Sequence, residues 1–285
     1  MKGKCALYDI ETELKLSHII PKFAFDYLKR TGGKYLRTYE NPDQRVQDGP
    51  KQYLLSEKAE QEFSKRERWF SNNIFLPYLK DNKTEFEYDE NFAYFIISVL
   101  WRVLIHQTHD EDEQRLDFLE EVKSEWKLFL ADSIYPRNFD DLNILLTDRI
   151  TSHNTTGINV DLYMSRIIDA TIIHNDNFTK VAVYVKFLRF MIWSVVKGDP
   201  NDCEDVKVKF IPNKLKSPQA LRDNFLGSFI MNRIEEIDNQ PKASEKQQEI
   251  IIKELLKNEE EFWSSDAGKS LISDYQKIKP ATNSR

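Results

Sequence analysis

An apolar run in the first half of the chain, FAYFIISVLWRVLI from Phe92 to Ile105, most constrains how this protein can fold. The run is shorter than the ~20 residues that a membrane-spanning helix needs, and it contains Arg102. A helix that is apolar around its whole circumference is buried inside a protein. The run therefore predicts a buried helix over residues 91–107, with other elements packed around it.

The remaining patterns mix helices with short strands. Apolar residues recur at helical spacing in four further regions, namely 22–30, 56–70, 111–131 and, in the last third, 218–237 with 244–262. Turn signals at 41–43 and 48–50 divide residues 32–55 into strand, turn and strand. Two β-rich runs within 163–196 flank an Asn-Asp-Asn turn and predict an antiparallel pair. The expected fold class is α+β: a small ββα module, then a mainly helical body with a small antiparallel hairpin or sheet.

Charge is distributed unevenly along the chain. The net charge is −6, but residues 1–80 hold 15 Lys and Arg against 11 Asp and Glu, a net charge of +4, and the remainder has a net charge of −10. Only the N-terminal part can favour a phosphate-bearing partner. This change in character, with the polar end KPATNSR, predicts a module over 1–80, a helical α+β domain over 81–276 and a flexible tail over 277–285.

Cysteine usage and the N-terminal residues bear on the compartment. The chain has two cysteines, Cys5 and Cys203, far apart in sequence. They provide no disulfide framework, and MKGKC lacks the apolar stretch of a secretory signal. We expect a cytoplasmic protein with no membrane partner.

Several short sequence motifs in the first 80 residues are best considered as one set. They are Ser17 to Phe23 (SHIIPKF), Gln47 to Lys51 (QDGPK), Tyr53 to Leu55 (YLL), and Glu60-Gln61 with Phe63-Ser64-Lys65. In these words the chain resembles the HNH, or His-Me finger, nucleases, in a bacterial subgroup whose finger is closed by two Cys-x-x-Cys pairs. The specific words cover only the first 80 residues, although VAVYVKFLRFMIW in the C-terminal part is loosely similar.

The resemblance implies a β-hairpin and a helix around a general-base histidine, which here is His18. The four zinc positions correspond to Cys5, Tyr8, Ser56 and Ala59. A structural zinc site needs four thiolate or imidazole ligands, so the resemblance implies a degenerate finger with no structural zinc. The alternative is that Cys5 and Tyr8 are ordinary strand residues.

The resemblance also implies a divalent metal, Mg²⁺ or Mn²⁺, beside the base. Ser17 precedes His18 and is a poor ligand. The carboxylates of Glu60 and Glu67 are the candidate metal ligands, and Lys22 and Lys65 are candidates for binding the nucleic-acid phosphate. Alternatively, these glutamates belong to a solvated helix face and His18 is a structural histidine.

Two functions follow from the resemblance. One is a nuclease-like protein that binds DNA or hydrolyses its phosphodiester bonds through His18 and a divalent metal. The other is a catalytically inactive, nuclease-derived module that contacts nucleic acid or a protein partner, in a bacterial setting such as phage defence. A separate metal cluster at His106 and His109 is a minor alternative, because acidic residues after a helix also suit the start of the next helix.

Overall fold

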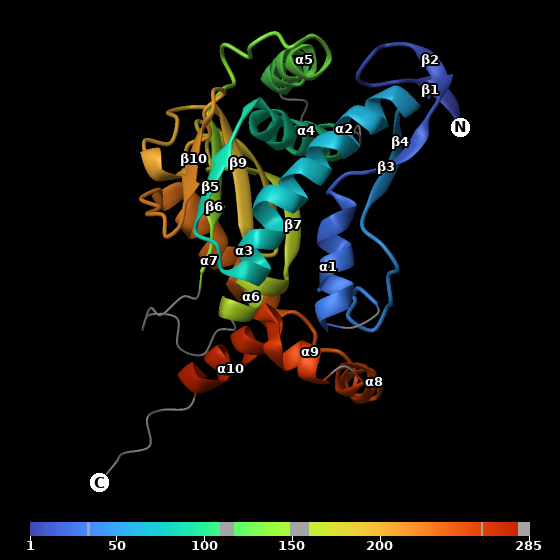
Figure 1. The fold of residues 1–285 in the computed structure, drawn as a ribbon, viewed down its shortest axis with the longest axis vertical. Coiled ribbons are helices and arrows are strands. Elements are labelled where there is room, and N and C mark those ends of the chain that lie inside the picture. The colour runs from blue at the N-terminus through green and yellow to red at the C-terminus, as the bar shows by residue number, and fades with distance from the viewer. Residues whose placement is uncertain (33–34, 109–116, 149–159, 258, 279–285) are drawn as a thin grey trace.

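A computed structural model of the chain describes residues 1–32, 35–108, 117–148, 160–257 and 259–278 (Figure 1). At its centre lies a four-stranded antiparallel sheet in the order β6-β9-β8-β7. The strands are β6 (Leu142–Leu146), β7 (Ile168–His174), β8 (Val181–Phe187) and β9 (Phe190–Lys197). β8 and β9 are joined by a tight turn in which Leu188 has a positive φ of 51°.

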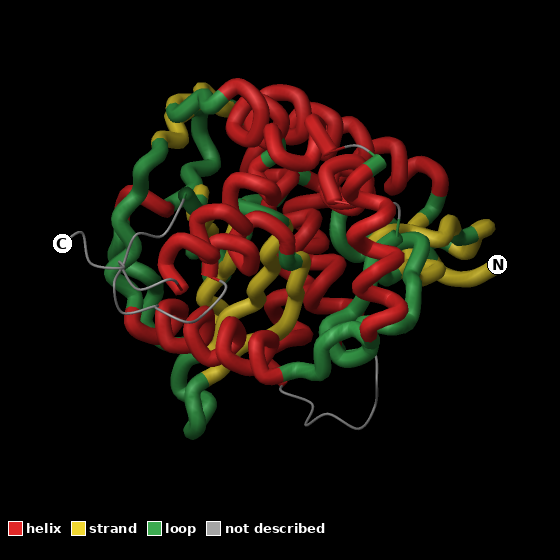
Figure 2. Tube along the Cα trace, turned by 90° about the horizontal axis from the view of Figure 1, so that it is seen from below, coloured by secondary structure: helices red, strands yellow, loops and turns green. Residues whose placement is uncertain are grey.

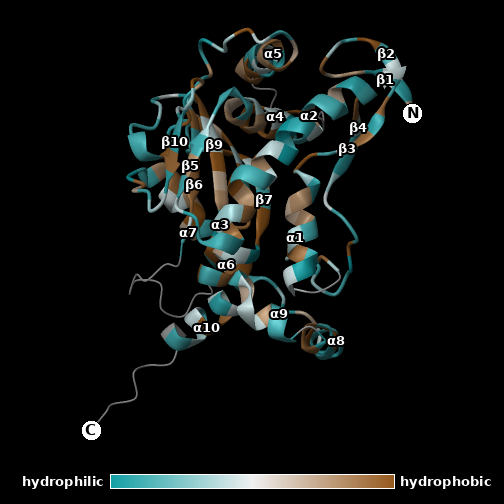
Figure 3. Cartoon of the chain, in the orientation of Figure 1, coloured by the Kyte–Doolittle hydropathy of each residue, from teal (hydrophilic) through white to brown (hydrophobic). Residues whose placement is uncertain are grey.

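Both faces of this sheet are covered by helices, as Figure 2 shows. Alternate residues of β8 divide between two buried clusters: Val183 and Val185 pack with the apolar helix α4 (Glu90–Gln107), and Tyr184 packs with α7 (Asn224–Asn239). Such two-sided burial requires a nearly continuous apolar strand, and Figure 3 shows the central strands coloured as hydrophobic.

The N-terminal part consists of two small β-pairs and two helices. β1 (Lys2–Lys4) pairs with β2 (Glu11–Glu13), and β3 (Lys15–His18) pairs with β4 (Lys51–Leu55), both antiparallel. Helix α1 (Lys22–Gly32) and a long loop connect β3 to β4. Helix α2 (Glu57–Phe70) follows β4 directly and continues through a π-helical turn (Ser71–Phe75) into α3 (Leu76–Asp81).

The remaining elements surround the central sheet. They are β5 (Glu85–Tyr88), which pairs with β10 (Asn213–Lys216), α5 (Asp117–Asp132), α6 (Val160–Arg166), a 3₁₀ turn (Glu204–Val206), α8 (Glu245–Leu256), α9 (Glu259–Ser264) and α10 (Asp266–Ile278). No helix in the described part of the chain is both long and apolar enough to cross a membrane.

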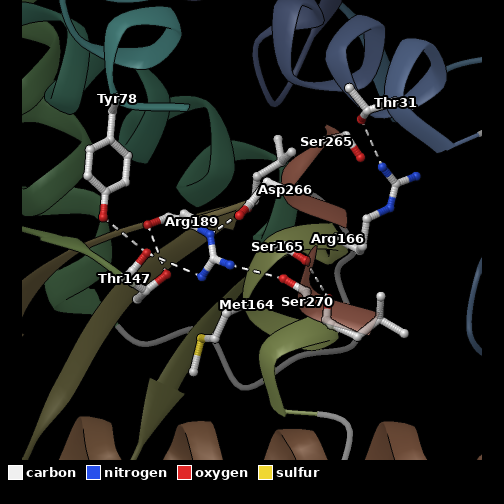
Figure 4. A network of polar contacts seen from close by, with 12 residues as sticks. Thr31, Tyr78, Thr147, Met164, Ser165, Arg166, Arg189, Ser265, Asp266 and Ser270 are labelled. Carbon is white, nitrogen blue, oxygen red and sulfur yellow. Dashed lines mark hydrogen bonds and ion pairs between the residues drawn. The ribbon is translucent and has the colours of Figure 1, made fainter. Parts of the chain in front are cut away.

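Buried polar contacts attach α10 to the sheet (Figure 4) and to α6. Arg189, after β8, forms an ion pair with Asp266 and donates a hydrogen bond to the Ser270 hydroxyl at 3.0 Å. Asp274 accepts hydrogen bonds from the backbone N–H groups of Asp161 and Leu162, in the first turn of α6. Carboxylates are favourable at a helix N-terminus, so Asp274 stabilises the short α6.

Most expected elements are present. The buried helix, the helix after Ser56, the helix over 22–30 and the antiparallel pair around 175–180 are confirmed, and so is the α+β class. Within the range expected for the helix over 111–131, the structure describes α5 from Asp117. Residues 279–285 of the expected tail lie outside the described residues.

Three expectations need correction. The helix expected from 218 begins only at Asn224, because Asp223 is its N-cap and accepts from the N–H groups of Phe225 and Leu226. The helix expected over 244–262 is two helices, α8 and α9. Within 32–55, the first expected strand is reduced to one bridge between Leu36 and Val46.

One buried cluster extends across the expected module boundary near residue 80. Phe70 of α2 stacks on Phe95 of α4 with ring centroids 4.1 Å apart, and it also meets Phe187 of β8 edge-on. The division into domains at 80 and 81 stays a prediction, and the N-terminal elements share their core with the rest of the chain.

Candidate functional site

His18 is the last residue of β3, and its position is set by the pairing with β4. The register places His18 opposite Lys51, the first residue of β4. Helix α2 begins at Glu57, two residues after β4 ends at Leu55. Along the chain the order is β3, α1, β4 and α2, so α1 lies between the two paired strands. The His18 side chain is 18% exposed, so its ring is partly open to solvent.

The imidazole of His18 is bound to a carboxylate from the loop before β4. Its Nε2 lies 3.0 Å from Oδ2 of Asp48. The same carboxyl group accepts from the Lys51 ammonium at 2.6 Å and from the Gly49 backbone N–H at 3.0 Å. Burial of Asp48 disfavours its ionised form, but the hydrogen bonds from Lys51, His18 and Gly49 outweigh burial and hold the pKa of Asp48 well below its usual range.

The ionised carboxylate determines which nitrogen of His18 carries a proton. An ionised carboxylate only accepts hydrogen bonds, and a neutral imidazole has one donor and one acceptor nitrogen. Nε2 of His18 therefore donates to Asp48, and Nδ1 is the acceptor in the neutral ring. An acid that orients a histidine in this way is the arrangement found beside general bases.

A second charged pair lies behind the backbone of His18. Arg102 of α4 donates to the His18 carbonyl oxygen at 2.8 Å and to Oε1 of Glu67 at 2.7 Å. The side chains of Arg102 and Glu67 are only 4% and 17% exposed. Arg102 thereby joins α2, α4 and β3, and it explains why an otherwise apolar helix contains a cation.

The two glutamates expected to bind a metal lie on one side of α2 but far apart. Seven residues separate Glu60 from Glu67, which is about 10.5 Å along a helix. Glu67 is paired with Arg102, whereas Oε1 of Glu60 is buried with no hydrogen-bond partner among the described residues.

Neither of the two lysines expected to bind phosphate hydrogen-bonds to His18 in the described part of the chain. Lys22, at the start of α1, forms an ion pair with Asp26 at 2.6 Å. Lys65 is exposed on α2, two residues from Glu67 and therefore about 160° around the helix from it. The structure does not bring Lys65 to the Glu67 side of α2.

The four positions that correspond to zinc ligands do come together. Sγ of Cys5 accepts a hydrogen bond from the Ser56 N–H at 3.2 Å, and the Ser56 hydroxyl accepts from the Ala59 N–H at 3.3 Å. Cys5 and Ala59 are completely buried, and the Tyr8 ring lies under the Lys58 ammonium at 4.7 Å. The start of the chain and the start of α2 are thus held by backbone hydrogen bonds and apolar contact.

The carboxylates linked to His18 pair with protein cations. Within the described ranges, no three His, Cys, Asp or Glu side chains converge to hold an ion. Asp48, which is hydrogen-bonded to His18, pairs with Lys51, and Glu67 pairs with Arg102, which donates to the His18 carbonyl oxygen.

Sequence reasoning missed three residues of this site. Asp48 and Lys51 fall within the QDGPK motif, but the motif alone does not show that they lie next to His18. Arg102 was visible as a charge inside an apolar run, which is a signal for a buried ion pair. Of the other metal candidates, His106 lies at the end of α4 and His109 lies outside the described residues.

Comparisons with protein-family models, with curated proteins and with solved structures found no match for this chain.

Proposed function

We propose that this chain is a nuclease-derived module that binds nucleic acid without hydrolysing it. The observation that carries the proposal is that protein cations neutralise the two carboxylates linked to His18. Lys51 pairs with Asp48, and Arg102, which donates to the His18 carbonyl oxygen, pairs with Glu67. The assignment of β3, β4 and α2 to a His-Me-finger-like module is part of the proposal. It is supported by the antiparallel pairing of β3 with β4, by the start of α2 directly after β4, and by the hydrogen bond between Cys5 and Ser56.

The surface of α2 supports a nucleic-acid partner. Lys58, Lys65 and Arg68 are exposed, and spacings of seven and three residues place them along one side of the helix. Among the described residues none of the three forms an ion pair with a carboxylate. Such a line of unpaired cations suits a phosphate backbone.

The exposed face of the β3–β4 ribbon adds an apolar contact. Tyr53 is 47% exposed and pairs across the ribbon with Leu16, which is 49% exposed. Aromatic side chains beside basic residues stack on unpaired bases. We therefore expect single-stranded nucleic acid to bind at least as tightly as duplex.

Binding is tested by fluorescence anisotropy with a labelled single strand and the matching duplex over a range of salt concentrations. The double variant Lys65→Gln/Arg68→Gln is expected to weaken binding of all sequences alike and to lower the salt dependence by about one to two phosphate contacts. The matched control is Lys246→Gln/Lys253→Gln on α8, which removes the same charge elsewhere. Equal affinity in the two double variants would contradict the α2 interface, and absence of binding by the wild type would favour a protein partner.

A second function, phosphodiester hydrolysis, is favoured by one specific observation. The Asp48–His18 hydrogen bond leaves Nδ1 of His18 free to accept a proton, which is what a general base needs. Wild type and His18→Ala are compared on plasmid DNA with Mg²⁺ or Mn²⁺. Intact plasmid with both proteins supports the binding module, whereas cleavage that is lost in His18→Ala would establish the nuclease.

A further inference from the structure

A cavity of about 640 Å³ lies between the N-terminal elements and the central sheet. It is lined by the β3–α1 connection, helix α1, the loop before β4, the last turn of α4 and the start of β7. Asp48, the partner of His18, lines one part of it. Ligand sites in proteins have volumes of about 300–1,000 Å³ and often lie where separate structural layers meet.

Most of the cavity wall is apolar. The contributing side chains from four different elements are Ile19, Ile20, Phe25, Leu28, Val103 and Ile168. All but Ile168 are buried residues of the main core, and Ile168 packs against that core. The wall is therefore rigid and suits the flat, apolar part of a small molecule.

Two arginines line the same cavity, and neither forms an ion pair with a carboxylate of the described residues. Arg166 donates to the Thr31 hydroxyl at 3.0 Å and to the Leu28 carbonyl at 3.1 Å (Figure 4). Arg37 donates to the Pro42 carbonyl and to the Gln247 side chain, both at 3.1 Å. A guanidinium group has five N–H donors, so each arginine has three further donors.

Two of the three carboxylates that line the cavity are, in contrast, paired with cations. Asp48 is held by Lys51 and His18, and Asp169 lies 3.0 Å from Nε of Arg233. Glu40 forms no ion pair among the described residues, so the two arginines outnumber it and the net charge of the cavity lining is positive. Burial lowers the pKa of Arg166 to about 10, against the opposing effect of the charges of Tyr27 and Asp266.

We propose that this cavity binds a small organic oxyanion, a molecule with a flat apolar body and one phosphate or carboxylate group, whose charge is neutralised by Arg37 and Arg166. Arginine matches both oxyanions with paired N–H donors, and such charge-assisted hydrogen bonds are stronger than neutral ones. The apolar wall holds the body of the ligand. This site is independent of the α2 surface and of the proposed nucleic-acid binding.

Isothermal titration calorimetry on the full chain tests the proposal with four probes. Adenosine 5′-monophosphate and naphthalene-2-carboxylate carry both required parts, adenosine lacks the anion, and inorganic phosphate lacks the body. We expect one-to-one binding of at least one of the first two probes, and weaker binding of the last two. The tighter of the first two probes assigns the site to phosphate or to carboxylate.

Variants show whether the arginines bind the anion. Arg37→Gln and Arg166→Gln are each expected to weaken binding of the anionic probe roughly tenfold or more. Arg37 lies in a half-buried loop, so its variant remains folded even if Arg166→Gln does not. The matched control, Arg45→Gln, removes a cation from the same loop whose guanidinium lies over the Tyr35 ring, and should bind like wild type.

Three results would overturn the proposal. They are absence of binding by both anionic probes at millimolar concentration, unchanged affinity in Arg37→Gln, and equal affinity for inorganic phosphate and adenosine 5′-monophosphate. The last result would show that the apolar wall contributes nothing.

Discussion

The buried pair of Arg102 and Glu67 gives the sharpest test of how cations hold the candidate site together. Arg102 makes three hydrogen bonds, to the carbonyl oxygens of Ser98 and His18 and to Glu67. Removing one partner of a buried ion pair costs about 3–5 kcal/mol, because the other charge remains buried without compensation. We therefore expect Arg102→Met to lower the free energy of unfolding by about that amount.

Urea unfolding followed by circular dichroism measures this change. With an m-value of about 3 kcal/mol per M, a loss of 3–5 kcal/mol lowers the unfolding midpoint by about 1–1.7 M. Replacing both partners, in Arg102→Met/Glu67→Leu, removes the orphaned charge and should recover most of the stability. The matched control is Lys123→Met, since Lys123 pairs with the exposed Glu120, and it should cost less than about 1 kcal/mol.

Two outcomes would refute this reasoning. A loss below about 1 kcal/mol in Arg102→Met would show that Glu67 is not held as an ionised, buried partner. A double variant as unstable as Arg102→Met would show that the arginine acts through its packing alone, since its guanidinium lies 5.3 Å from the centre of the Phe63 ring.

Three further predictions concern stability. The lowered pKa of Asp48 stabilises the folded state at pH values above the ordinary carboxyl pKa of about 4, and this stabilisation is lost as the pH falls below that value. Between pH 7 and pH 2, the free energy of unfolding should therefore fall less in Asp48→Asn than in wild type. Parallel falls in the two proteins would contradict this role of Asp48. Cys5→Ala removes the acceptor of the buried Ser56 N–H and should lower the free energy of unfolding by about 1–3 kcal/mol. A chelator should leave the melting temperature of the wild type unchanged. A fall of several degrees, together with stoichiometric zinc in the protein, would disprove that Cys5, Tyr8, Ser56 and Ala59 are held together without zinc. Asp274→Ala removes two hydrogen bonds at the N-terminus of α6 and should lower the free energy of unfolding by about 1–2 kcal/mol, measured by thermal unfolding. Asp274→Asn should be closer to wild type. Identical melting temperatures for both variants and the wild type would contradict the capping role.

The elements predicted best from the sequence are those whose signals are local. The continuous apolar run around Trp101 specifies a buried helix wherever it packs, and Ser56 before an amphipathic stretch specifies a helix start through its own hydroxyl. The start of α7 was misplaced because Asp223 competes as an N-cap with the Pro218 signal upstream. Local patterns of this kind do not show which of two neighbouring start signals is used.

The candidate site was predicted only in part because its contacts are long-range. His18 was identified from the SHIIPKF motif, but its partner Asp48 lies 30 positions away along the chain. Arg102 reaches the same strand from 84 positions away. No periodicity or spacing encodes such contacts, and the pairing of Glu67 with Arg102, 35 positions further along the chain, is another contact of this kind.

Manganese binding tests the central claim most directly, because protein cations are proposed to have replaced the metal beside His18. Isothermal titration of Mn²⁺ into the wild type and His18→Ala should show no one-to-one binding in the micromolar range for either protein. One Mn²⁺ bound tightly by the wild type and lost in His18→Ala would contradict the account.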